Sequence, residues 1–101
     1  MFVNLTPHAI VVAGRTFQPS GTVARVSQVN TVIGTTHDGI ELVQASFGAV
    51  MDLPEPVAGT LFIVSAMVRN AVSERKDLVS PGDAIRDADG KIIGVKNLVI
   101  N

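Results

Sequence analysis

Cysteine, tryptophan and tyrosine are absent from the 101-residue sequence, and phenylalanine occurs only four times. Without cysteine the chain cannot form disulfide bonds, thiolate zinc sites or a cysteine nucleophile. Four phenylalanine rings are a poor platform for stacking the bases of single-stranded RNA or DNA. These absences exclude disulfide-stabilised and thiol-based proteins and argue against a protein that binds nucleic acid strands.

An excess of charge of either sign is also missing. Eight basic residues face nine acidic ones, and the net charge is −1. A nearly neutral chain has no electrostatic drive toward duplex nucleic acid or toward an anionic membrane surface. We therefore expect that neither a nucleic acid polymer nor a membrane is a partner of this protein.

Charged residues make up only 17% of the chain and apolar residues 47%, whereas typical proteins have about 25% charged residues. A small domain has much surface relative to its volume, so part of this apolar content should lie at the surface. Contact between subunits is the usual way to cover such surface. The composition therefore predicts a homo-oligomer.

Long apolar runs are scarce as well. Residues 1–20 do not combine a basic segment with a sustained apolar stretch, as a secretory signal would. No run approaches the roughly 18–20 apolar residues of a membrane span. We expect a soluble, cytoplasmic protein in which residues 1–101 form a single domain.

The residues that are abundant indicate strands and turns. Val, Ile and Thr recur throughout, and Gly or Pro interrupts them at short intervals. The apolar run at 60–64 predicts a buried central strand, and Asp89-Gly90 between apolar segments predicts a hairpin across 84–95. Further strands are expected at 2–5, 8–14, 15–18, 22–34, 40–48 and 96–101.

One helix is expected, over residues 65–77. Ser65 can act as its N-cap, because a serine hydroxyl accepts a hydrogen bond from a free backbone N–H of the first turn. Met67, Val68, Ala71 and Val72 would form its apolar stripe. The sequence thus predicts an α+β fold: a β-rich single domain with one main helix, about 65–77, packed on a mostly antiparallel sheet.

Motifs for metals, phosphates and hydrolysis are incomplete or absent. The segment Asp87–Lys91 is similar to part of a calcium loop, but the first and twelfth ligand positions would fall on Ile85 and Lys96, which are unsuitable. A hairpin turn explains it better. His8 and His37 are too few for a metal site without thiolates. No GxxxxGK[ST], GxGxxG or GxSxG pattern occurs, so we expect no metal, no cofactor and no complete catalytic set.

The segment NLTPHAI (4–10) is the first candidate for a binding site. Asn4, Thr6 and His8 alternate, so in an extended chain they point to one side while Leu5 points to the core. Pro7 favours extended backbone at Thr6. The amide, hydroxyl and imidazole together suit a ribose or the edge of a base. The same polar groups could instead close backbone turns.

The expected helix carries the second candidate. Ser65 lies where free backbone N–H groups could hold a phosphate or carboxylate, unless it is only a cap. Arg69, Arg75 and Asp77 cluster in the second half of the expected helix. Their guanidinium groups could bind phosphate, or the three residues could belong to a solvated face with local ion pairs. Arg75 aligns with the apolar stripe, so it must extend to solvent, pair with a carboxylate such as Asp77, or meet a ligand.

Three segments resemble a group of small uncharacterised proteins of bacteriophages and actinobacteria that share an N-terminal NLTPH motif. These segments are NLTPHAI (4–10), LPEPVAGTLFIVS (53–65) and RKDLVSPGDAIRDADGKIIGVKNL (75–98). A phage origin would place the protein in the cytoplasm of the host cell. The resemblance also implies an anti-defence role, because small oligomeric phage proteins act as sponges that sequester nucleotide immune signals such as ADP-ribose derivatives and cyclic nucleotides.

The leading hypothesis is a protein that binds a small nucleotide-type ligand without catalysis. Base or ribose contacts are expected from Asn4, Thr6 and His8, and phosphate contacts from Ser65, Arg69 and Arg75 beside Asp77. One alternative is a nucleotide-processing enzyme with His8 as general base and Asp77 as the group that orients it. Another is a structural or host-interaction protein without a small ligand. The binding hypotheses require the N-terminal segment and the helix to share one pocket.

Overall fold

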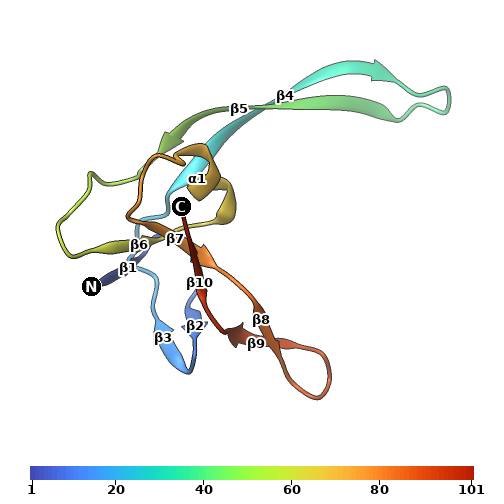
Figure 1. Cartoon of the computed structure of the whole chain (residues 1–101). Helices are drawn as coiled ribbons and strands as arrows, with labels where there is room; N and C mark the ends of the chain where they lie inside the picture. The colour runs from blue at the N-terminus through green and yellow to red at the C-terminus, as the bar shows by residue number, and fades with distance from the viewer.

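Three sheets and one short helix form the chain in a computed structural model that describes residues 1–101 (Figure 1). The coarse prediction of a mostly β, α+β chain is confirmed, and most expected strands are present. The elements are β1 (Phe2–Asn4), β2 (Ile10–Val12), β3 (Arg15–Phe17), β4 (Arg25–Thr35), β5 (Glu41–Met51), β6 (Leu61–Ile63), α1 (Ala66–Ala71), β7 (Leu78–Pro81), β8 (Ala84–Arg86), β9 (Ile92–Val95) and β10 (Leu98–Ile100).

The central sheet has the strand order β1-β6-β7-β10 and holds most of the core. Strand β6 comes from the apolar run at 60–64, and Phe62, Ile63 and Val64 are at most 3% exposed. The prediction of a buried central strand is therefore confirmed. Both neighbours of β6 run parallel to it, and only β10 is antiparallel to its partner β7. The prediction of a single, mostly antiparallel sheet is thus wrong, because the chain has three sheets and the central one is mainly parallel.

The helix is shorter than predicted, because α1 ends at Ala71 and not at residue 77. Its N-terminus is as expected: Ser65 is extended and its Oγ accepts a hydrogen bond from the N–H of Val68. The chain leaves helical geometry at Val72 (φ −126°, ψ 57°). It must turn there so that the carbonyl of Asp77 can accept from the N–H of Phe62, which starts the next parallel pairing.

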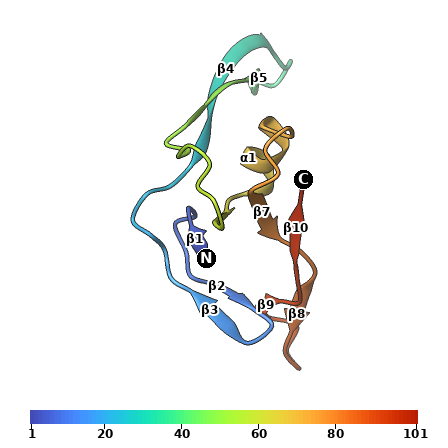
Figure 2. The same cartoon turned by 60° about the vertical axis from the view of Figure 1, so that its left-hand side comes forward.

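A second sheet, with the order β3-β2-β9-β8, lies at one end of the molecule (Figure 2). The hairpin predicted at 84–95 is confirmed, because β8 and β9 pair antiparallel around the turn at Asp87–Lys91. In that turn Asp87 Oδ1 accepts hydrogen bonds from the N–H groups of Asp89 and Lys91. Strand β2 adds to β9 in parallel at the other side.

The third sheet is a two-stranded ribbon made of β4 and β5, which we call the arm (residues 25–51). Figures 1 and 2 both show it projecting away from α1 and the central sheet, at the end opposite the second sheet. The turn expected at 36–39 closes it, with Thr36 Oγ1 accepting from the N–H of Ile40. Two register shifts, between Val26 and Gln28 and between Val32 and Gly34, bend the ribbon.

The projecting arm leaves the chain with little core for its size. Only 11 of 101 residues are buried, and the surface area is 6660 Å². A compact monomer of 10.6 kDa would expose about 5,500 Å². The radius of gyration is 16.8 Å, whereas about 13 Å is expected for a compact chain of this length. The single chain therefore exposes more surface than a globular domain does. No helix of the structure has the length and apolar character that a membrane crossing requires.

Candidate functional site

The first candidate, Asn4, is a buried structural hub. Its side chain is only 2% exposed. The amide Nδ2 donates to the carbonyl oxygens of His8 at 2.8 Å and Phe17 at 2.9 Å. Its Oδ1 accepts from the backbone N–H of Thr6 at 2.9 Å and from the Thr6 hydroxyl at 2.6 Å. All hydrogen-bonding groups of the Asn4 amide are thus engaged within the chain, in the turn bonds that the sequence left open as an alternative.

His8 differs from its two neighbours in the motif, because its side chain is exposed and its ring makes no hydrogen bond. The network uses only the backbone carbonyl of His8, which lies 3.0 Å from the Thr6 hydroxyl. The side chains of Asn4 and Thr6 therefore shape the turn after β1, while the imidazole remains available to solvent. This geometry gives the side chains of Asn4 and Thr6 a structural role and leaves the His8 side chain without one.

Arg69 is also engaged within the chain. Its Nε donates to Ser80 Oγ at 2.8 Å on β7, and its Nη1 donates to Asn101 Oδ1 at 3.1 Å. The Ser80 side chain is 1% exposed. Arg69 thus joins α1 to the central sheet and to the last residue of the chain, instead of pointing into a hollow.

Arg75 takes the second of its three predicted alternatives and pairs with Asp77. Its Nε and Nη2 donate to Oδ1 and Oδ2 of Asp77, each at 2.7 Å, and Nη2 also donates to the carbonyl of Pro54 at 3.0 Å. These hydrogen bonds stabilise the charged forms, so they lower the pKa of Asp77 and raise the pKa of Arg75. Both carboxylate oxygens of Asp77 are occupied, and no hydrogen bond joins them to His8.

Replacing Asp77 by asparagine is expected to lower the free energy of unfolding by about 1 kcal/mol at pH 7, because the pair is partly exposed and screened by solvent. The pKa of Asp77 is depressed in the folded chain, so its stabilisation is complete above the unfolded value of about 3.9 and is lost as the pH falls through the folded pKa. Urea unfolding of both proteins between pH 2 and 7 measures this. A difference that stays constant over the whole range would contradict the assignment.

The side chain of Asn101 stabilises the end of the helix, a role that the sequence did not indicate. Its Nδ2 donates to the carbonyls of Arg69 at 3.0 Å, Val72 at 3.3 Å and Arg75 at 3.0 Å. These carbonyls lie at the end of the short helix and in the turn after it, where a helix leaves carbonyls without intrahelical partners. The carbonyl of Val72 also accepts from the N–H of Arg75. A side chain that is 26 or more positions away in the sequence supplies this cap, and no local pattern could have indicated it.

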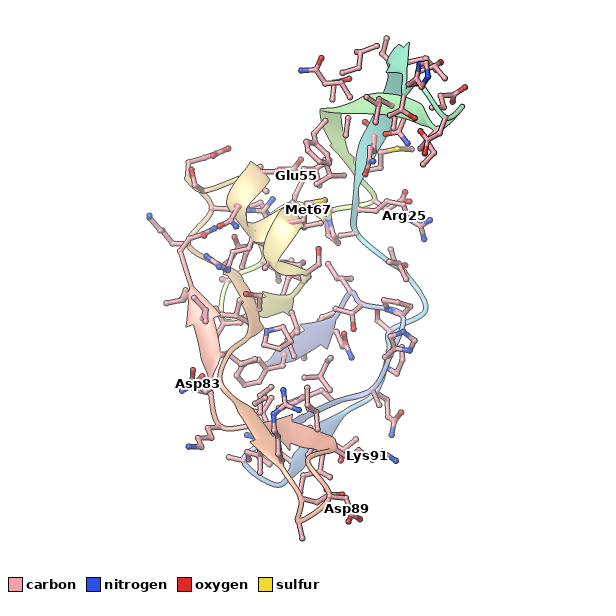
Figure 3. All side chains as sticks on the ribbon, turned by 90° about the vertical axis from the view of Figure 1, so that its right-hand side faces the viewer. Arg25, Glu55, Met67, Asp83, Asp89 and Lys91 are labelled. Carbon is pink, nitrogen blue, oxygen red and sulfur yellow. The ribbon has the colours of Figure 1, made fainter.

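Two of the predicted residues, Thr6 and Ser65, do come together. They line a hollow of about 240 Å³ between the turn after β1, the start of α1 and the base of the arm. Arg25, which the sequence analysis missed, also lines the hollow, and its exposed side chain has no hydrogen-bond or ion-pair partner within the chain. Figure 3 shows Arg25 at the start of β4 and Met67 on α1 at the same level of the molecule. The full lining is Leu5, Thr6, Pro7, Val23, Ala24, Arg25, Val26, Ser65 and Met67.

The hollow brings together only part of the predicted site. Neither Asn4 nor His8 lines it, and neither do the two arginines and the aspartate of the helix region. The anion site expected at the helix start is reduced to the Ser65 hydroxyl, because α1 has only six residues and its first turn is capped. A second hollow of about 250 Å³ lies between β2 and β9 and is lined mainly by apolar side chains, among them Ile10, Ile92 and Ile93.

Comparison of the chain with protein-family models, curated proteins and solved structures finds no match.

Proposed function

We propose that the protein is a subunit of a homo-oligomer that binds a small phosphate-bearing ligand of the nucleotide type and leaves it chemically unchanged. The observation that carries this proposal is the hollow at the base of the arm, which is lined by Thr6 and Ser65 and by Arg25, whose guanidinium has no partner within the chain. A guanidinium and hydroxyls are the groups that hold phosphate and ribose oxygens.

The contacts within this hollow can be assigned by chemistry. Ser65 Oγ accepts from Val68, so its own proton is free to donate to a phosphate oxygen beside Arg25. Pro7 and Met67 give the hollow an apolar wall, which suits the face of a base. Compared with the sequence-based assignment, Ser65 keeps a role as a donor. Thr6 lines the hollow, but its hydroxyl donates within the chain and can only accept from a ligand. Asn4, Arg69, Arg75 and Asp77 are assigned to the fold.

Binding without reaction is favoured over the enzyme alternative by the partners of Asp77. A histidine that acts as general base needs a group that orients its ring. Arg75 occupies both oxygens of the Asp77 carboxylate, and the His8 ring has no hydrogen-bond partner. The resemblance to phage proteins suggests that the bound molecule is an immune signal, which the oligomer would sequester in the cytoplasm of the host cell.

The test is recovery of a ligand after binding. The protein is mixed with cyclic ADP-ribose isomers, ADP-ribose or a cyclic dinucleotide, freed of unbound ligand and denatured by heat, and the released molecule is identified by mass spectrometry. We expect intact ligand and a raised melting temperature. Chemically altered ligand would favour the enzyme alternative, and the absence of both bound ligand and thermal shift would contradict the proposal.

Arg25→Ala is expected to weaken this binding by about 10- to 100-fold, since a charge-assisted hydrogen bond to phosphate is lost. Isothermal titration calorimetry with the recovered ligand measures the effect. Arg15→Ala is the matched control, because Arg15 is also exposed but lies over the Phe17 ring at 5.0 Å, outside the hollow. Equal affinities of the Arg25→Ala variant and the unaltered protein would remove Arg25 from the site.

A structural or host-interaction protein without a small ligand is the second candidate. It is favoured by the arm, whose exposed apolar side chains suit assembly rather than chemistry. The same recovery experiment decides between them, because a purely structural subunit would assemble but bind none of the nucleotides.

A further inference from the structure

One face of the arm continues the face that packs into the core. In the antiparallel register, residues opposite each other share a face, and successive pairs alternate. At the base, the pair Val26 and Val50 packs against the core cluster. The same face continues outward through the pairs Gln28–Phe47, Asn30–Ala45 and Val32–Val43. We call the side chains of Phe47, Ala45, Val32 and Val43 the stripe.

Nothing in the chain covers the stripe. Phe47 is 57% exposed, Val32 54% and Val43 47%, although the residues at the base of the same face are partly buried. A two-stranded ribbon by itself is only marginally stable in water. The whole chain exposes 6660 Å², roughly 1,200 Å² more than a compact monomer would. This excess is larger than the about 800 Å² that each partner contributes to a standard interface.

The chemistry of the arm indicates what covers it. Residues 26–36 and 42–51 contain no charged side chain. Such a surface offers nothing to a nucleic acid or to a strongly charged protein. In a two-fold symmetric interface, a surface meets an identical copy of itself. Because this surface has no charged side chain, such a contact places no like charges opposite each other.

We propose that two copies of this chain form a two-fold symmetric dimer. In this dimer the arms cross face to face, and the stripe of each copy covers the stripe of the other. The proposal rests on the oligomer part of the proposed function and names its surface. With the two-fold axis near Ala45, the small side chain lets the ribbons approach. Phe47 and Val43 are each two residues from Ala45, in opposite directions along β5. The two-fold axis therefore places the large Phe47 of each arm against Val43 of the other arm.

The test is the molar mass of two variants that differ only in the face they alter. Val32→Lys places an ammonium group in the stripe, whereas Val29→Lys, three residues away on the same strand, places it on the opposite face. Val29 is 62% exposed, similar to Val32, and neither residue belongs to the core cluster. Sedimentation velocity over a concentration series gives the dissociation constant, and circular dichroism checks that the folds match.

We expect that the unaltered protein and Val29→Lys form dimers, and that Val32→Lys weakens the dimer by about 100-fold or more. Equal weakening by both variants, or by neither, would overturn the assignment of the stripe. An oligomer that persists in Val32→Lys would leave the proposed function intact and move its interface elsewhere. A monomeric unaltered protein would overturn both the stripe and the oligomer, whereas failure to bind nucleotides would overturn only the ligand.

Discussion

Asn4→Ala is expected to lower the free energy of unfolding by about 3 kcal/mol, the largest effect of any single substitution outside the core. The substitution removes the donor to the carbonyls of His8 and Phe17 and the acceptor for both Thr6 donors. Each group left buried without a partner costs about 1–3 kcal/mol, although some will gain water. Urea unfolding followed by circular dichroism measures the change.

The control for this prediction is Gln18→Ala. Gln18 is exposed after β3, away from the arm, and its side chain makes no hydrogen bond, so the change in unfolding free energy should stay within about 0.5 kcal/mol. If Asn4→Ala does not fold, Thr6→Val tests the same network more mildly and should cost about 1 kcal/mol. An Asn4→Ala protein as stable as the Gln18→Ala control would show that the network does not hold the N-terminal turn.

Asn101→Ala is expected to lower the free energy of unfolding by about 2 kcal/mol. It removes the donor to the carbonyls of Arg69, Val72 and Arg75 and the acceptor of the Arg69 guanidinium. The loss is smaller than for Asn4, because these groups are only partly buried and water can replace the amide. The effect should concentrate at α1, so hydrogen exchange of the Val72 amide should accelerate by at least about 10-fold.

Asn70→Ala provides the comparison for this second prediction. Asn70 is exposed on the same helix, and its side chain makes no hydrogen bond. Its replacement by alanine, a better helix former, should leave stability unchanged or slightly raised. If both variants show the same exchange rates at α1, the role of Asn101 as the cap of the helix would be wrong.

Local patterns were sufficient to predict the elements that depend on local chemistry. The apolar run at 60–64, the Asp89-Gly90 turn and the Ser65 cap are each explained by residues within a few positions. The length of the helix was not predictable in this way. Its end is set by the hydrogen bond from the N–H of Phe62 to the carbonyl of Asp77 and by the side chain of Asn101, which are contacts between residues distant in sequence.

The candidate site shows the same division. The spacing of Asn4, Thr6 and His8 predicts side chains that act together. Asn4 and Thr6 do so, whereas His8 contributes only its backbone carbonyl, and the turn also requires Phe17 from another strand. Arg25 carried no signal, because only the fold places the start of β4 beside Ser65. The alternation of residues 40–48 predicted a strand, yet it could not show that the ribbon projects from the chain with its apolar face uncovered.

In the proposed dimer, the arm of one chain is completed by the arm of a second copy. Since the chain has no cysteine, Gln44→Cys accepts a single spin label on the outer face of the ribbon, next to Ala45 at the proposed axis. Pulsed electron paramagnetic resonance then measures the distance between the labels of two chains. The account predicts one narrow distance of roughly 25 Å, since facing sheets pack about 10 Å apart, and its loss when Val32→Lys is added. No coupling between labels, or a distance that Val32→Lys leaves unchanged, would contradict it.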